Sequence, residues 1–276
     1  MMKIIADSSA NIPALAGASY QSVPMTIRAG ERDFVDDETL DPHELLDYLA
    51  SYSGKSGTAC PSLDCWLRAF EGADEIFVLT ITSRLSGTCA SAMAARDVYL
   101  QSHPDTKIHV FDTLSTGPEM QLLAERIAAL YAMGLSFDVI CEKAREYLAT
   151  THLFFRLKSL HNLAQNGRVS KLTAGAVGIL GIQILSTASS EGTIQPVEKC
   201  RGEKKTREAM VQHILDTGYR GGKVRIHHAE NPDAAGALAA SLRERFPEAD
   251  IEILPCAGLC SYYAERGGVI VGFETI

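Results

Sequence analysis

The sequence lacks any long hydrophobic run. Its most apolar stretch, residues 174–185, is interrupted by three glycines and by Gln183, and it is shorter than the ~20 residues that a transmembrane helix needs. At the N-terminus, the apolar residues 4–6 are followed at once by Asp7, far short of the hydrophobic segment of a secretory signal peptide. We therefore expect no integral membrane segment and no cleaved leader.

Positive charge is also scarce. The chain has 26 Lys and Arg against 34 Asp and Glu, which gives a formal net charge of -8. A chain with this charge gains no general attraction to phosphate backbones or to anionic membrane surfaces. We therefore expect no nucleic-acid partner.

The seven cysteines follow no disulfide or metal pattern. Their number is odd, and a chain of this length does not need disulfides for stability, so reduced thiols in the cytoplasm are expected. Two pairs lie close in sequence, Cys60 with Cys65 and Cys256 with Cys260, but neither is accompanied by the matching second pair of a structural zinc site. We predict no bound metal.

The common nucleotide-binding and hydrolase motifs are missing as well. The sequence contains no P-loop, no Gly-x-Gly-x-x-Gly and no Gly-x-Ser-x-Gly. The histidines are candidate general bases, but the sequence does not place any of them near a serine. No cofactor is predicted, and a catalytic function has no direct support.

What the sequence does contain is the composition of a globular protein. Hydrophobic residues make up 46% and charged residues 22%, and 276 residues are enough for two domains. In the first half, apolar runs, helix-capping signals and helical periodicity alternate along the chain. They predict strands at 3–6 and 76–81, and helices at 42–52, 122–131 and 139–148. Such alternation is typical of a mostly parallel sheet with helices on both faces, in three layers.

The pattern changes near Thr151, where glycines break up an apolar region without clear periodicity. Beyond it, strands are predicted at 223–228, 250–254 and 269–273, with an intervening helix that carries Ala235, Leu238 and Leu242 on one face. We therefore predict a two-domain α/β protein. Its mostly parallel N-terminal domain spans residues 1–152, and a smaller α/β domain spans residues 153–276.

Loops rich in hydroxyl residues form the strongest chemical signal. They occupy residues 7–9, 56–62, 82–88 and 112–117, and three of them follow predicted strands. Hydroxyls and free backbone N–H groups at helix starts bind anions, and parallel sheets gather such loops at one edge. For any one serine, plain helix capping is the simpler interpretation. The clustering of the loops favours a ligand site.

Two basic points accompany these loops. Arg168 lies in the turn Asn166-Gly167-Arg168, and Arg201 lies in a segment with neighbouring lysines. The arginine fork matches a carboxylate or a phosphate. A surface salt bridge remains the alternative for each of them.

In this order, the loops resemble those of the DegV family, bacterial fatty-acid-binding proteins that serve as lipid-carrying subunits of fatty acid kinase. The resemblance spans nearly the whole chain. It rests on the segments at residues 7–10, 58–62, 83–88, 112–117, 167–170, 199–202 and 271–273.

The resemblance implies a long-chain fatty acid held in a tunnel between the two domains. By position, the carboxylate-binding residues would be Thr58, Ser86, Gly87, Arg168 and Tyr263. The supporting loop residues would be Ser8, Ser9, Ser62, Ser83, Thr88 and Arg201. The glycine-rich segment 174–185 has the composition of a tunnel wall, and equally that of an ordinary core helix.

The resemblance also implies a non-catalytic carrier, with the carboxylate phosphorylated by a separate ATP-dependent kinase. The family's His-x-Gly-Pro-Gly segment is absent, and Tyr263 stands at the position of its histidine. Two other functions stay open: a small-molecule transferase or hydrolase that uses the same hydroxyl loops, and a regulatory protein that senses lipid.

Overall fold

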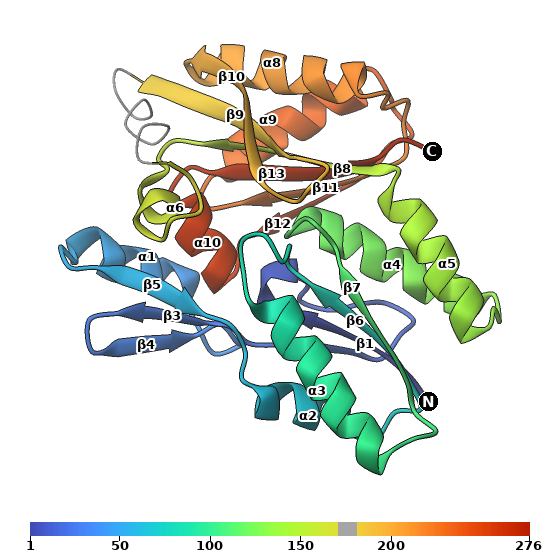
Figure 1. The fold of residues 1–276 in the computed structure, drawn as a ribbon. Helices are drawn as coiled ribbons and strands as arrows, with labels where there is room; N and C mark the ends of the chain where they lie inside the picture. The colour runs from blue at the N-terminus through green and yellow to red at the C-terminus, as the bar shows by residue number, and fades with distance from the viewer. Residues whose placement is uncertain (171–180) are drawn as a thin grey trace.

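The computed structural model describes residues 1–170 and 181–276, which form three β-sheets with helices between and around them (Figure 1). The first sheet is wholly parallel, in the order β2-β1-β6-β7. Its strands are β1 (Met2–Asp7), β2 (Tyr20–Val23), β6 (Glu75–Thr80) and β7 (Lys107–Asp112). A short 3-10 turn, η1 (Ser8–Ala10), follows β1.

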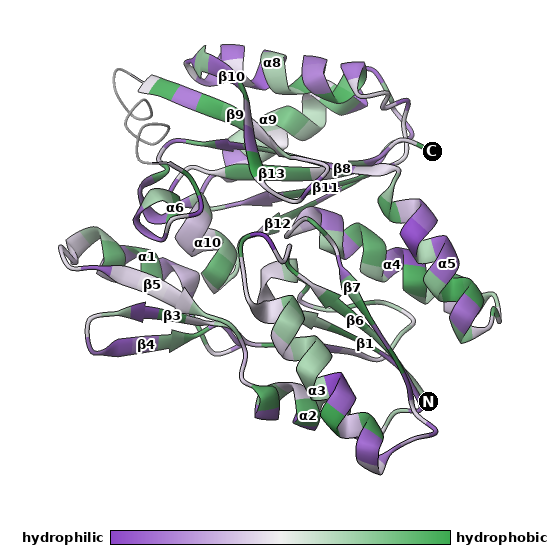
Figure 2. Ribbon diagram, viewed as in Figure 1, coloured by the Kyte–Doolittle hydropathy of each residue, from purple (hydrophilic) through white to green (hydrophobic). Residues whose placement is uncertain are grey.

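Helices cover both faces of this parallel sheet. Alternate residues of a strand point to opposite faces, so Ile4 packs in one core and its neighbour Ile5 in another. The helices are α2 (Leu63–Phe70) and α3 (Thr88–Ser102) on one face, and α4 (Pro118–Ala132) and α5 (Phe137–Leu148) on the other. Polar and apolar residues alternate around α5 in Figure 2, as expected of a helix with one buried side.

A small antiparallel sheet adjoins the parallel one, in the order β4-β3-β5. Its strands are β3 (Thr26–Ala29), β4 (Arg32–Val35) and β5 (Ser56–Ala59). Helices α1 (Pro42–Ser51) and α10 (Gly258–Ala264) share a core with it. The sequence did not lead us to expect this sheet.

The third sheet has six strands in the order β10-β9-β8-β13-β11-β12. Only β11 and β12 run parallel, and the other neighbours are antiparallel. The strands are β8 (Thr151–Leu157), β9 (Ile182–Ala188), β10 (Ile194–Arg201), β11 (Lys223–His228), β12 (Asp250–Pro255) and β13 (Val269–Glu274). One face is covered by α8 (Glu203–Asp216) and α9 (Pro232–Arg243), and the other packs against the short α6 (His161–Gln165) and α10.

The predicted two-domain α/β architecture is confirmed. The predicted strand at 223–228 and the predicted helix after Asp41 are also present. The Asp41 carboxylate caps this helix by accepting a hydrogen bond from the N–H of His43. The predicted division at residues 152 and 153 falls within β8. Because β8 pairs with β13 from Thr151 onward and with β9 from Phe154 onward, all of β8 lies in the six-stranded sheet.

Candidate functional site

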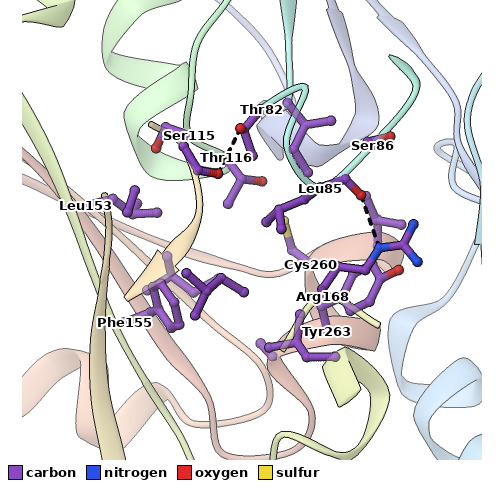
Figure 3. Close-up of a pocket in the computed structure, with 18 of the residues that line it drawn as sticks. Thr82, Leu85, Ser86, Ser115, Thr116, Leu153, Phe155, Arg168, Cys260 and Tyr263 are labelled. Carbon is purple, nitrogen blue, oxygen red and sulfur yellow. Dashed lines mark hydrogen bonds between the residues drawn. The ribbon is translucent and has the colours of Figure 1, made fainter. Parts of the chain in front are cut away.

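A cavity of about 850 Å³, including its open mouth, lies between the parallel sheet and the six-stranded sheet (Figure 3). It sits at the carboxyl ends of β6 and β7, which is where ligands bind in open parallel sheets. Its walls come from the loops after β6 and β7, from β8, from the turn between β9 and β10, and from α10.

Most of the cavity wall is apolar. Leu153, Phe155 and Leu157 are alternate residues of β8, so all three side chains point into the cavity from one face of the sheet. The apolar surface continues through Leu259 and Ala264 on α10 and through Ile270 on β13, the strand that pairs with β8. A wall of this kind suits a hydrocarbon chain, because neither needs a hydrogen-bond partner.

One end of the cavity is polar and is formed by Thr58, Ser86, Arg168 and Tyr263. Thr58 on β5 and Tyr263 on α10 are joined by a hydrogen bond of 2.8 Å between their hydroxyls. The Ser86 hydroxyl is 2.8 Å from that of Thr88 at the start of α3. Four segments distant in sequence therefore bring three hydroxyls and one guanidinium together.

Arg168 is the one charged residue lining this cavity in the part of the chain that the structure describes. Its Nε donates to the carbonyl of Leu85 at 3.0 Å, and its Nη1 donates to the carbonyl of Asn166. Both acceptors are neutral, and Arg168 forms no ion pair with any described carboxylate. A partly buried cation without a counter-ion favours an anionic ligand.

The opposite end of the cavity is closed by hydroxyls that already bind protein acceptors. The Ser115 hydroxyl donates to the buried carboxyl of Glu119, and the Thr82 hydroxyl donates to the carbonyl of Gly192 at 2.9 Å. Burial raises the pKa of Glu119 above its usual value. The two ends of the cavity therefore differ in charge, because the Arg168 guanidinium lies at one end and the buried carboxyl of Glu119 lies behind the other.

Several predicted supporting residues lie outside the cavity wall. The Ser8 hydroxyl accepts from the N–H of Met25 at 3.1 Å, and the Ser9 hydroxyl donates to Asp7. Ser62 caps α2 by accepting from the N–H of Cys65. Ser62 thus takes the helix-capping role that was the alternative interpretation, whereas Ser8 and Ser9 bind within the loops around the end of β1.

The remaining predicted residues also act behind the wall or away from it. Gly87 is the residue that precedes α3, and Thr88 is buried against Ser86. Ser83 is exposed, and its N–H donates to Asp112 at 3.0 Å. Arg201 is exposed at the end of β10 and does not line the cavity. Of the predicted tunnel-wall segment, residues 174–180 lie outside the described residues.

The contributions of β8 and of the turn between β9 and β10 were not predicted from the sequence. No periodicity marks β8, because apolar side chains on both of its faces are buried in two different cores. The polar contacts among the neighbouring residues Ser56, Asn166 and Tyr262 were not predicted either. The Tyr262 hydroxyl lies 2.8 Å from the Ser56 hydroxyl and accepts from the Asn166 amide at 2.8 Å.

Across residues 1–170 and 181–276, no three His, Cys, Asp or Glu side chains are grouped so that they could hold a metal ion. Over the same residues, no helix combines the length and apolar character of a membrane span.

The fold and the cavity together define a two-domain α/β binding protein, with an apolar internal site and one cationic end. Comparison with known sequences makes the class specific. Residues 1–275 match the family described as "Uncharacterised protein, DegV family", and the chain belongs to the DegV family.

Its relatives cover the whole molecule. A DegV domain-containing protein of Streptococcus pneumoniae is 44% identical over 99% of this chain and 98% of its own. Among solved structures, a DegV family protein from Eubacterium eligens loaded with heptadecanoic acid is 47% identical, with a TM-score of 0.98. The S. pneumoniae Fatty Acid Kinase (Fak) B3 protein loaded with linoleic acid is 43% identical, with a TM-score of 0.97. Both structures are covered completely and cover this chain completely.

Proposed function

We propose that this protein binds one long-chain fatty acid, with the acyl chain in the apolar cavity and the carboxylate at Arg168. One observation carries the proposal: the only charged side chain on the described wall of a mostly apolar cavity is a cation without a counter-ion. The hydroxyls of Thr58, Ser86 and Tyr263 supply further donors at the same end.

The energetics of burial support an acyl ligand. Enclosing a ~16-carbon chain at about 0.8 kcal/mol per CH₂ gives on the order of 12 kcal/mol of transfer free energy. Part of this is offset by the cost of immobilising the ligand. An ionised carboxylate in the same site is costly unless protein donors surround it. The observed asymmetry, apolar along β8 and cationic at Arg168, meets both requirements.

The relatives support the same ligand class and suggest a partner. Fatty acids are bound in the E. eligens and S. pneumoniae structures, and the latter protein is named as part of a fatty acid kinase. We propose that the present chain presents the carboxylate of its bound fatty acid to an ATP-dependent fatty acid kinase. Its seven cysteines are free thiols, which supports the cytoplasm as its location.

A transferase or hydrolase is less favoured by the cavity. No His, Asp, Glu or Lys is among the described residues that line it, so a general base is missing from the wall. Cys260 lines the cavity, but burial raises the pKa of its thiol well above the usual value. A buried neutral thiol is a poor nucleophile. We therefore propose a carrier without catalytic activity of its own.

Native mass spectrometry of the recombinant protein tests the proposal, followed by extraction and identification of the released ligand. We expect one fatty acid per chain. Arg168→Gln, or Thr58→Ala combined with Ser86→Ala, should abolish retention, whereas Arg28→Gln on the exposed side of β3 should not. The proposal would be contradicted by a wild-type protein that carries no ligand and does not bind added fatty acid. Full retention in both Arg168→Gln and the Thr58→Ala, Ser86→Ala double variant would contradict it as well.

A further inference from the structure

A second cleft lies on the other face of the six-stranded sheet, between α8 and α9. It encloses about 830 Å³, again including its open side. Strand β8 divides its side chains between the two sites: Phe155 and Leu157 line the first cavity, and Arg156 lines the second cleft, together with Lys158 just after the strand. The two sites are thus back to back, with the sheet between them.

Arg156 is the unusual residue of this cleft. It is 3% exposed, and its Nη1 donates to Gln183 at 2.6 Å and to Glu203 at 2.5 Å. Its Nη2 is buried and has no hydrogen-bond partner in the part of the chain that the structure describes. A buried N–H of a charged group without an acceptor is costly, so an acceptor supplied by a ligand would stabilise it.

The charges around Arg156 do not balance. Arg156, Lys158 and Arg207 line the cleft with two carboxylates, those of Glu203 and Asp233. Glu203 pairs with both Arg156 and Lys158, the latter at 3.0 Å. Arg207 forms no ion pair with a described carboxylate, which leaves one positive charge in excess.

Both helices also present their N-terminal ends to this cleft. It is lined by the first residue of α8 and by Asp233 and Ala234 in the first turn of α9. The residue before each helix, Gly202 or Asn231, forms no side-chain cap. Free backbone N–H groups at such ends, together with the helix dipole, add to the attraction for an anion.

We propose that this cleft is a second ligand site, which binds a small organic phosphate. The phosphate accepts hydrogen bonds from Arg207 and from the first turn of α9, and the Arg156 guanidinium turns toward the cleft so that its Nη2 donates to the same phosphate. Arginine forks and helix starts are the groups that bind phosphate best. Met210 and Leu238 form an apolar floor for the organic part of the ligand. The proposal does not depend on fatty-acid binding in the first cavity.

Titration calorimetry with inorganic phosphate and with phenyl phosphate tests it on the full chain at low salt. Both probes should bind saturably, and phenyl phosphate should bind several-fold more tightly because its ring covers the apolar floor. Amide shifts of Ala234, followed by NMR, should locate the site. Equal affinities would overturn the role of the floor. The absence of saturable binding of either probe up to about 10 mM would overturn the whole proposal.

Matched variants separate a site from general charge effects. Arg207→Gln should weaken phosphate binding about tenfold or more, because a charge-assisted hydrogen bond is lost. Lys204→Gln, on the same helix but outside the cleft, should leave it unchanged. Glu203→Gln should strengthen binding, since it removes a competing carboxylate. Equal weakening by Arg207→Gln and Lys204→Gln would overturn the proposal, and so would weaker binding in Glu203→Gln.

Discussion

Tyr263 occupies the polar end of the first cavity, and its hydroxyl is 2.8 Å from that of Thr58. Tyr263→Phe removes one hydroxyl and leaves the ring in the wall. We expect fatty-acid affinity to fall about two- to tenfold, which corresponds to one neutral hydrogen bond. Competition against a fluorescent fatty acid measures this. Tyr131→Phe on the exposed side of α4 is the control. An unchanged affinity in Tyr263→Phe would exclude its hydroxyl from the head-group site.

Asp7 predicts how stability depends on pH. Burial raises its pKa from 3.8 to about 6, although Ile81 and Ser9 donate hydrogen bonds to its carboxylate. Between about pH 4 and 6, the folded protein therefore holds a proton that the unfolded chain has released. The contribution of Asp7 to the free energy of unfolding must therefore fall by roughly 3 kcal/mol in all as pH rises through this window, and it is constant above the window.

The variant Asp7→Asn cannot titrate and should lose this contribution to the pH dependence. We expect the free energy of unfolding of Asp7→Asn, taken relative to that of the wild type, to rise from pH 4 to pH 6. Above about pH 6 the difference between the two proteins should stay constant. Urea unfolding at four pH values measures both proteins. Parallel curves throughout the window would show that Asp7 is ionised in the fold at pH 4.

The residue scale also shows what a sequence can say about a site. The hydroxyl-rich loops favoured an anion site, and the family resemblance singled out positions 58, 86 and 168 within it; these three side chains line one end of the cavity. Their binding role stays a prediction. Ser9 and Ser62 looked the same in sequence but hold loops and helix ends. A hydroxyl that caps a helix and one that faces a ligand differ only in what lies opposite, which is set by tertiary contacts.

At the scale of elements, the turn between β9 and β10 closes the far end of the cavity. Gly192 in this turn has φ +79°, and a Cβ there would meet Thr82 Oγ1 at 2.2 Å and Leu114 Cα at 3.1 Å. Gly192→Ala should push the turn away from the loop after β6. We expect fatty-acid release to accelerate several-fold, measured by transfer of labelled ligand to vesicles.

Gly72→Ala is the matched control for this variant. Gly72 has nearly the same φ, +75°, but no atom lies within 4 Å of the new Cβ. Both variants should therefore lose roughly 1 kcal/mol of stability from backbone strain alone. Only Gly192→Ala should change the rate of ligand release. Equal rates in the two variants would mean that the turn does not close the cavity.

Elements with strong local signals were predictable from the sequence, and those set by distant contacts were not. Asp41 and Pro42 mark the start of α1 through capping, which is local. The strands of the small antiparallel sheet have four residues each, and β5 reads Ser56-Gly57-Thr58-Ala59, the composition of a loop. Its strand geometry comes from pairing with β3, whose sequence gives no sign of it.

For the molecule as a whole, α4 joins the two domains. It packs on β1 and β6 of the parallel sheet and also on β8, β11 and β13 of the six-stranded sheet, and ten of its 15 residues are buried. Glu125 on this helix receives two hydrogen bonds of 2.7 Å from Arg225 on β11. A helix buried on both sides has no single apolar face, so its sequence predicted a helix but not its position between two sheets.

The contact between α4 and β13 provides a test of this coupling. A Cβ at Gly272 would lie 2.8 Å from the backbone of Pro118 and Glu119, so Gly272→Ala should force the two domains apart. We expect it to cost at least about 2 kcal/mol, as overpacking in a core does.

Trp66, the only tryptophan, is buried in the first domain and reports on that domain alone. In wild-type protein its fluorescence and the far-UV circular dichroism should change together in urea. In Gly272→Ala the dichroism should change first, because the six-stranded sheet loses its support, whereas Gly236→Ala, which has open space, should keep the two transitions together. Coincident transitions in Gly272→Ala would show that α4 does not couple the domains through this contact.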